Sequence, residues 1–249
     1  MTNTRNDLVA VVTGAGRGIG QDLALRLAVD GASVAVNDRT DVGETVDLIE
    51  KAGGRAIGVV ADVSTEDGVE LLRAKSTEAF GTVNVVVNNA GLMPGAGILD
   101  VTVEEWDRVQ ATNVRGSFLV SRAFVPGMKE QGWGRIVEIS STSFFMPMAG
   151  MLAYITSKGA MIAFGRALSA EAGDWGITVN TIASGAVVTP GTQEEGWADR
   201  FPGIAASAQA LKRVGRGSDV AGALAFLVSD DASHMTGQTL VVDGGMAHV

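Results

Sequence analysis

The chain has 249 residues, of which 46% are hydrophobic, and its 19 Lys and Arg against 28 Asp and Glu give a formal net charge of −9. This length fits one α/β domain spanning residues 1–249, and the acidic balance argues against a nucleic-acid partner. Because cysteine is absent and the two histidines, His234 and His248, both lie near the C-terminus, we expect no disulfide and no metal site.

The first predicted elements are a buried strand, a glycine-rich turn and a helix. An apolar run over residues 8–12 is followed by the turn TGAGRGIG, residues 13–20, and then by a helical pattern that contains Leu23 and Leu27. Glycines let the backbone approach a pyrophosphate closely, and the helix N-terminus favours its negative charge. The strand, turn and helix together therefore predict a dinucleotide-binding site.

The second predicted strand, residues 33–37, is followed by an acidic residue. Asp38 lies eighteen positions after Gly20, where a carboxylate accepts hydrogen bonds from the adenosine ribose of NAD and repels the 2′-phosphate of NADP. The cofactor is therefore predicted to be NAD rather than NADP. Arg17 and Arg39 favour NADP instead, because either guanidinium could attract the 2′-phosphate. Asp38 could also simply cap the turn that leads into Asp41.

Strands and helices continue to alternate along the rest of the chain. Strands are predicted over residues 56–60, 83–87, 135–141, 177–182 and 239–242, and helices over 42–52, 65–80, 103–111, 114–128, 152–172 and 218–229. This alternation predicts a doubly wound parallel sheet with helices on both faces and ligands at the C-terminal ends of the strands. Residues 183–216 interrupt it and are predicted to form a lid or binding loop. Asn113, a poor helix former, predicts a kink or a water-binding site, unless it is merely exposed.

Residues 141–158 contain the candidate catalytic side chains. Tyr154 is the only tyrosine; it lies thirteen positions after Ser141 and four before Lys158, so Tyr154 and Lys158 share one face of the predicted helix. An adjacent ammonium lowers the pKa of a phenol from about 10, which would let Tyr154 exchange a proton near neutral pH. The same spacing is common on helix surfaces, so this interpretation depends on the hydride donor that the glycine turn implies.

Taken together, these motifs resemble the short-chain dehydrogenase/reductase family. The glycine turn at 13–20, the NNAG at 88–91, Asn113, Ser141, the YxxxK at 154–158 and the VDGG at 242–245 occur in the order and spacing of that family, over essentially the whole chain. The resemblance implies a Rossmann-type seven-stranded sheet, a nicotinamide cofactor and a homotetramer.

The resemblance also assigns roles to individual residues. Ser141 would hold the substrate oxygen and Tyr154 would exchange its proton. Lys158 would bind the nicotinamide ribose and lower the pKa of Tyr154, and Asn113 would fix a water in the proton relay. Besides Tyr154 and Lys158, the cofactor residues would be Gly14, Arg17, Gly18, Ile19, Gly20, Asp38, Asp62, Val63, Asn89, Ala90, Gly185, Val187 and Thr189. The chain has Ser184 where the family often has proline, so the turn that positions the nicotinamide lacks that constraint.

The expected substrate is a small hydrophobic ketone or secondary alcohol, aryl compounds included. Phe144, Met148 and Trp197 lie in segments that could face the same cleft as Ser141 and Tyr154, although apolar residues of this kind fill cores and subunit contacts equally well. Within the family, the sequence is most similar to 1-phenylethanol dehydrogenase and related secondary-alcohol dehydrogenases, over residues 123–129, 132–136 and 229–233. Those segments are scaffold, so they indicate ancestry more than specificity.

Other functions remain open at this stage. An NADPH-dependent 3-oxoacyl-carrier-protein reductase shares all these motifs, and turnover with NADH compared with NADPH separates the two. A non-catalytic dinucleotide-binding sensor would not need Ser141, Tyr154 and Lys158 together, and a serine hydrolase would need a G-x-S-x-G elbow that is absent. No window approaches the roughly 20 apolar residues of a membrane span, and the start MTNTRND lacks the apolar core of a signal peptide, so we expect a cytoplasmic protein without a membrane partner.

Overall fold

The computed structural model describes residues 8–248, which form a seven-stranded parallel sheet in the order β3-β2-β1-β4-β5-β6-β7. The doubly wound parallel fold predicted from the sequence is therefore confirmed. The polar start of the chain, on which the expectation of a missing signal peptide rests, lies outside the described residues. The strands are β1 (Val9–Val12), β2 (Ser33–Asp38), β3 (Arg55–Val60), β4 (Val85–Asn88), β5 (Gly134–Ser141), β6 (Ile177–Ser184) and β7 (Thr239–Val242).

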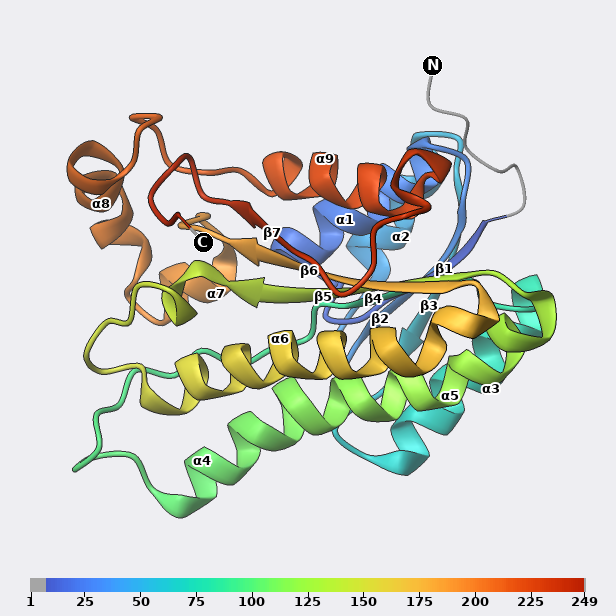
Figure 1. Ribbon diagram of the computed structural model, residues 1–249, viewed down its shortest axis with the longest axis horizontal. Helices are drawn as coiled ribbons and strands as arrows, with labels where there is room; N and C mark the ends of the chain where they lie inside the picture. Colours follow the sequence, from blue (N-terminus) through green and yellow to red (C-terminus); the bar gives the residue numbers. More distant parts are fainter. Residues whose placement is uncertain (1–7, 249) are drawn as a thin grey trace.

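Two layers of helices cover the two faces of this sheet (Figure 1). One face carries α1 (Gly18–Val29), α2 (Gly43–Lys51) and α9 (Gly217–Val228). The other carries α3 (Glu66–Phe80), α4 (Val103–Gln110), α5 (Gly116–Gln131) and α6 (Leu152–Ala172). Within residues 8–248, no helix combines the length and the apolar character needed to cross a lipid bilayer.

Apolar side chains of the strands alternate between two cores, one on each face of the sheet. In β1, Ala10 and Val12 pack with the core formed by α1 and α9, whereas Val11 packs with the core formed by α3 and α5. Both faces are covered, which is why the strands read as continuous apolar runs in the sequence. Each fully buried Val or Leu contributes about 1.5–3 kcal/mol relative to an exposed one, and together they fix the edge at which the strands end.

The junction between α4 and α5 is a π-helical turn, Ala111–Arg115. The helix is therefore irregular at Asn113, and the alternative of an exposed side chain is wrong because Asn113 is fully buried. Insertion of one residue into the helical ladder turns the Asn113 side chain inward, and such turns recur at functional sites.

The segment predicted to be irregular, residues 183–216, contains two short helices. They are α7 (Pro190–Glu194) and α8 (Phe201–Ala208), which lie beyond the C-terminal ends of β5 and β6 (Figure 1). A threonine capping box and a proline in the first turn start α7, and the buried Phe201 and Ala205 fix α8. We call residues 187–208 the lid.

Candidate active site

A cavity of about 390 Å³ lies at the C-terminal edge of the sheet, between the glycine turn, the ends of the strands and the lid. Most of the residues predicted to bind a cofactor line it, namely Gly14, Arg17, Gly18, Ile19, Gly20, Asp38, Asp62, Val63, Asn89, Ala90, Tyr154, Lys158 and Thr189. Parallel strands place their C-terminal ends at one edge, which explains why residues so distant in the sequence meet here.

Gly185 and Val187 do not line this cavity, and Ser184 does. The Gly185 amide donates to the carbonyl of Val242 at 2.9 Å, and Val187 pairs with Gly215 in an isolated parallel bridge. The turn that lacks the family's proline is thus anchored by backbone contacts instead.

The glycine turn is held against the end of β4. The Thr13 hydroxyl accepts the amides of Asn89 and Ala90, each at 3.1 Å, and the Asn89 side-chain amide donates to the carbonyls of Thr13 and Gly14, each at 2.9 Å. Gly14 has φ of +62°, and a Cβ atom there would lie 2.7 Å from the Cα of Ala90. Only glycine combines that backbone conformation with so close an approach. The resulting cradle of backbone groups suits a pyrophosphate.

Asp38 joins the end of β2 to the glycine turn. One carboxylate oxygen accepts the Gly16 amide at 3.2 Å, and the other accepts the amide and the hydroxyl of Thr40 at 3.2 and 3.1 Å. The capping role considered from the sequence is therefore real. A carboxylate has about four acceptor positions, so Asp38 retains capacity for a ribose hydroxyl.

Ser141, Tyr154 and Lys158 come together where β5 ends and α6 begins. Tyr154 lies in the first turn of α6, and its side chain interacts with that of Ser141, the last residue of β5. The Lys158 ammonium is buried; it donates to the carbonyl of Ile139 at 2.7 Å and lies 5.6 Å from the centre of the Tyr154 ring. The Ser140 hydroxyl donates to the Lys158 carbonyl at 2.9 Å, which ties α6 to β5.

The pKa of Tyr154 is raised above 10.0 rather than lowered, because burial outweighs the opposing hydrogen bond from Ser141. The net shift is opposite to the lowering expected from Lys158, whose ammonium donates to the Ile139 carbonyl. Burial also lowers the pKa of Lys158 to about 8, against the opposing charge of Glu138. At neutral pH the phenol is therefore protonated and the lysine is mostly charged.

Asn113 connects this site to the segment after β4. Its side-chain oxygen accepts the Leu92 amide at 2.8 Å, and its side-chain nitrogen donates to the Leu92 carbonyl at 3.0 Å and the Ser157 hydroxyl at 2.8 Å. The Asn113 side chain and the Lys158 ammonium both lie beside Gly91, where a Cβ atom would be 3.5 Å from each of them. The predicted role in a water relay stays a prediction.

Of the residues predicted to line a substrate pocket, only Tyr154 lines the cavity. Phe144 and Met148 are 44% and 40% exposed, and the Phe144 ring packs against Gly159, whose missing side chain leaves room for it. Trp197 is buried in a small apolar cluster with Met151 and Phe201, and Tyr154 and Met93 pack at its edge. Leu92 and Met93 are among the apolar residues that line the cavity itself.

Two residues that were not selected from the sequence adjoin this site. Glu138, in the middle of β5, is fully buried and accepts a hydrogen bond from the Asn88 amide at 2.6 Å. Glu194, at the end of α7, forms an ion pair with Arg17. Glu138 carries one local signal, a charge within an apolar strand, whereas Glu194 lies 177 positions from its partner and carries none. Within the described residues, no group of three or more histidine or carboxylate side chains could hold a metal ion.

Comparisons with known proteins agree with this geometry. Residues 14–247 match a family model described as enoyl-(acyl carrier protein) reductase. The chain is 41% identical over 244 residues to the short-chain reductase protein NovJ of Streptomyces niveus, covering 95% of this chain and 93% of that one. It is 36% identical over 239 residues, 95% of each chain, to the hydroxy(phenyl)methylsuccinyl-CoA dehydrogenase subunit BbsD of Thauera aromatica. Among solved structures, a point variant of actinorhodin polyketide ketoreductase with NADPH has a TM-score of 0.92 and 35% identity and covers 100% of both chains.

Proposed function

The chain belongs to the short-chain dehydrogenase/reductase family, and we propose that it is an NAD(H)-dependent enzyme that interconverts a hydrophobic secondary alcohol, aryl alcohols included, and its ketone. One observation carries this proposal. Tyr154 and Lys158 line the same cavity as the glycine turn, and the Tyr154 side chain interacts with that of Ser141.

The residues of the cavity fit a nicotinamide dinucleotide. The glycine cradle suits the pyrophosphate, and Asp38 can accept a hydrogen bond from a ribose hydroxyl. The Lys158 ammonium lines the same cavity. Bound there, such a cofactor supplies or accepts a hydride.

Protonated Tyr154 is suited to donate a proton to the alkoxide that develops when a ketone is reduced. Ser141 hydrogen-bonds the same oxygen, and both bonds strengthen as negative charge grows on it, which is the differential binding that accelerates a reaction. The Lys158 charge, held beneath the ring, opposes the desolvation penalty that a phenolate would meet. In the direction of oxidation, the same groups act in reverse.

An apolar surround supports the proposed substrate class. Leu92 and Met93 line the cavity, and Trp197 and Met151 pack beside Tyr154. The name of the relative BbsD specifies a hydroxy(phenyl)methyl group, which is an aryl secondary alcohol. We therefore infer that an aryl ring can lie against this surface while its carbinol carbon faces Tyr154.

A second candidate is an NADPH-dependent 3-oxoacyl-carrier-protein reductase. It is favoured by the description of the matching family model, which names the acyl carrier protein, and by the NADPH in the actinorhodin ketoreductase structure. The net charge of −9 opposes it, because a carrier protein that is acidic needs a basic docking surface.

The experiment is a substrate panel run with NADH/NAD and with NADPH/NADP. The panel contains acetophenone, 1-phenylethanol, an aliphatic methyl ketone and an acetoacetyl thioester. We expect turnover of the aryl pair with NADH/NAD, and loss of about 10²–10⁴-fold in Tyr154→Phe with NADH binding retained. Near wild-type turnover in that variant would sink the mechanism, and turnover confined to the thioester with NADPH would favour the second candidate.

A further inference from the structure

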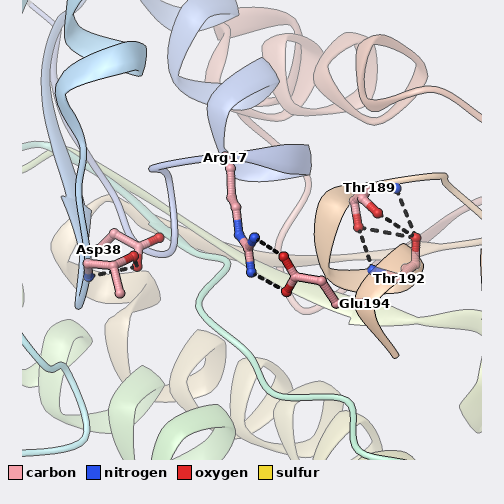
Figure 2. Close-up of polar contacts among 6 residues, drawn as sticks. Arg17, Asp38, Thr189, Thr192 and Glu194 are labelled. Carbon is pink, nitrogen blue, oxygen red and sulfur yellow. Dashed lines mark hydrogen bonds and ion pairs between the residues drawn. The ribbon is translucent and has the colours of Figure 1, made fainter. Parts of the chain in front are cut away.

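Arg17 and Glu194 form a link between the glycine turn and the lid across the cofactor cavity (Figure 2). The two guanidinium nitrogens Nη1 and Nη2 donate to the two carboxylate oxygens of Glu194 at 2.5 and 2.8 Å. This fork-to-fork geometry uses both terminal nitrogens of the guanidinium at once. The side chains are 54% and 60% exposed, so the pair lies at the mouth of the cavity rather than inside it.

Glu194 is presented to Arg17 by a helix that is itself fixed. The Thr189 amide donates to the Thr192 hydroxyl at 2.9 Å, and the Thr192 amide donates to the Thr189 hydroxyl at 3.1 Å, which closes a capping box at the start of α7. The Thr189 side chain also packs on the glycine turn, since a Cβ atom at Gly18 would lie 3.3 Å from it. One end of α7 is therefore held by packing and the other by the ion pair.

Arg17 is also the residue that made the cofactor preference ambiguous in the sequence. It lines the cavity together with Asp38. The hydrogen bond that Arg17 donates to Glu194 is the main cause that raises the pKa of Arg17, and the charge of Asp38 adds to it. Figure 2 shows the guanidinium extending between Asp38 and Glu194. An unpaired guanidinium near the adenosine ribose accommodates a 2′-phosphate. A guanidinium already paired with a carboxylate offers much less to that phosphate.

We propose that Glu194 is a cofactor-selecting residue that holds Arg17 in the lid and so withholds it from the 2′-phosphate of NADP. The inference rests on the proposed use of a nicotinamide dinucleotide. Asp38 disfavours the phosphate directly, and Glu194 removes the cation that would otherwise compensate. The same ion pair fastens α7 over the cavity mouth.

The test compares Glu194→Gln with Glu195→Gln, which removes the same charge from the adjacent lid residue that does not pair with Arg17. Dissociation constants of NADH and NADPH are measured by nicotinamide fluorescence without substrate. We expect Glu194→Gln to shift the ratio of the two constants toward NADPH by about two- to fivefold, the range for an exposed ion pair. Glu195→Gln should match the wild type. Arg39 also lines the cavity, but it is common to every variant and cancels in the ratio.

Two further measurements decide between pairing and a general effect of charge. In an Arg17→Gln background, Glu194→Gln should no longer change the ratio, because the double-mutant cycle isolates the pair. Without any cofactor, amide exchange over residues 190–195 should be faster in Glu194→Gln than in Glu195→Gln. Equal ratios in the two single variants, or a shift that persists without Arg17, would overturn the inference. A wild-type protein that binds neither cofactor would instead overturn the proposed function.

Discussion

Glu138 is a buried carboxyl group that the proposed reaction does not use directly. Burial raises its pKa to about 7, against hydrogen bonds from Asn88 and Ser117 and the charge of Lys158. The unfolded-state value is near 4.5. The folded protein therefore retains this proton between the two values, and stability falls as pH rises through that window. Above about pH 7, the buried Glu138 carboxylate is ionised and lowers the stability of the folded protein. Its charge also raises the pKa of Lys158.

Replacing Glu138 with glutamine removes the ionisable group and keeps the size and shape of the side chain. We expect Glu138→Gln to be more stable than the wild type at about pH 8, by the order of 1–3 kcal/mol, with the difference shrinking toward about pH 5. Urea unfolding at both pH values measures this. In parallel, the alkaline limb of the reductive pH profile should move to lower pH, because Lys158 loses a neighbouring negative charge. A variant that is equally destabilised at both pH values would contradict this account.

Ser141, Tyr154 and Lys158 were selected by their spacing together with the glycine turn and the family resemblance, but these signals did not describe the electrostatics of the three residues. The i,i+4 relation put Tyr154 beside Lys158 correctly, since α6 begins at Leu152. The direction of the Tyr154 pKa shift could not be predicted, because it depends mainly on the burial of the phenol in the folded chain. Glu194 likewise meets Arg17 only through the tertiary position of the lid.

At the scale of elements, the sequence predicted the helices and strands that carry a long apolar pattern. The helix expected over residues 152–172 is α6 with the same bounds, and each predicted strand has a counterpart. The short helices α7 and α8 were missed, because five and eight residues are too few to show a period and too few to be stable alone. Contacts of Phe201 with Trp197 and Met151 hold α8 in place.

The π-helical turn between α4 and α5 gives a prediction about a single element. Asn113→Ala removes the three hydrogen bonds to Leu92 and Ser157 and leaves buried groups without partners, which should cost about 2–4 kcal/mol of unfolding free energy. Urea denaturation measures the loss, and amide exchange at Leu92 locates it. Ser157→Ala is the control: it removes one of these three bonds, together with the bond that the Ser157 hydroxyl donates to the Tyr154 carbonyl, and leaves both bonds to Leu92 intact. Similar losses in the two variants would show that Asn113 does not hold the segment after β4.

At the scale of the whole molecule, the outer surface of the α4 and α5 layer lacks a cover (Figure 1). Val103 is 71% exposed and Phe118 is 44% exposed, and Phe118 lines a groove with Arg108 and Val114. Apolar surface of this kind marks sites of association. The alternation of strands and helices predicted the sheet, but a single chain cannot specify what covers its outer helices. The family resemblance implies a homotetramer built from the two long helices and the C-terminal strand.

A charge placed on this surface tests that assembly. We expect the wild type to behave in light scattering as four chains of 25.6 kDa each, and Phe118→Asp to give a smaller species, because an unpaired carboxylate in an apolar interface is strongly unfavourable. Val29→Asp is the control: Val29 is 62% exposed at the end of α1, on the opposite face of the sheet. Far-ultraviolet circular dichroism should match in all three proteins. A tetramer that survives Phe118→Asp, or dissociates equally with Val29→Asp, would place the interface elsewhere.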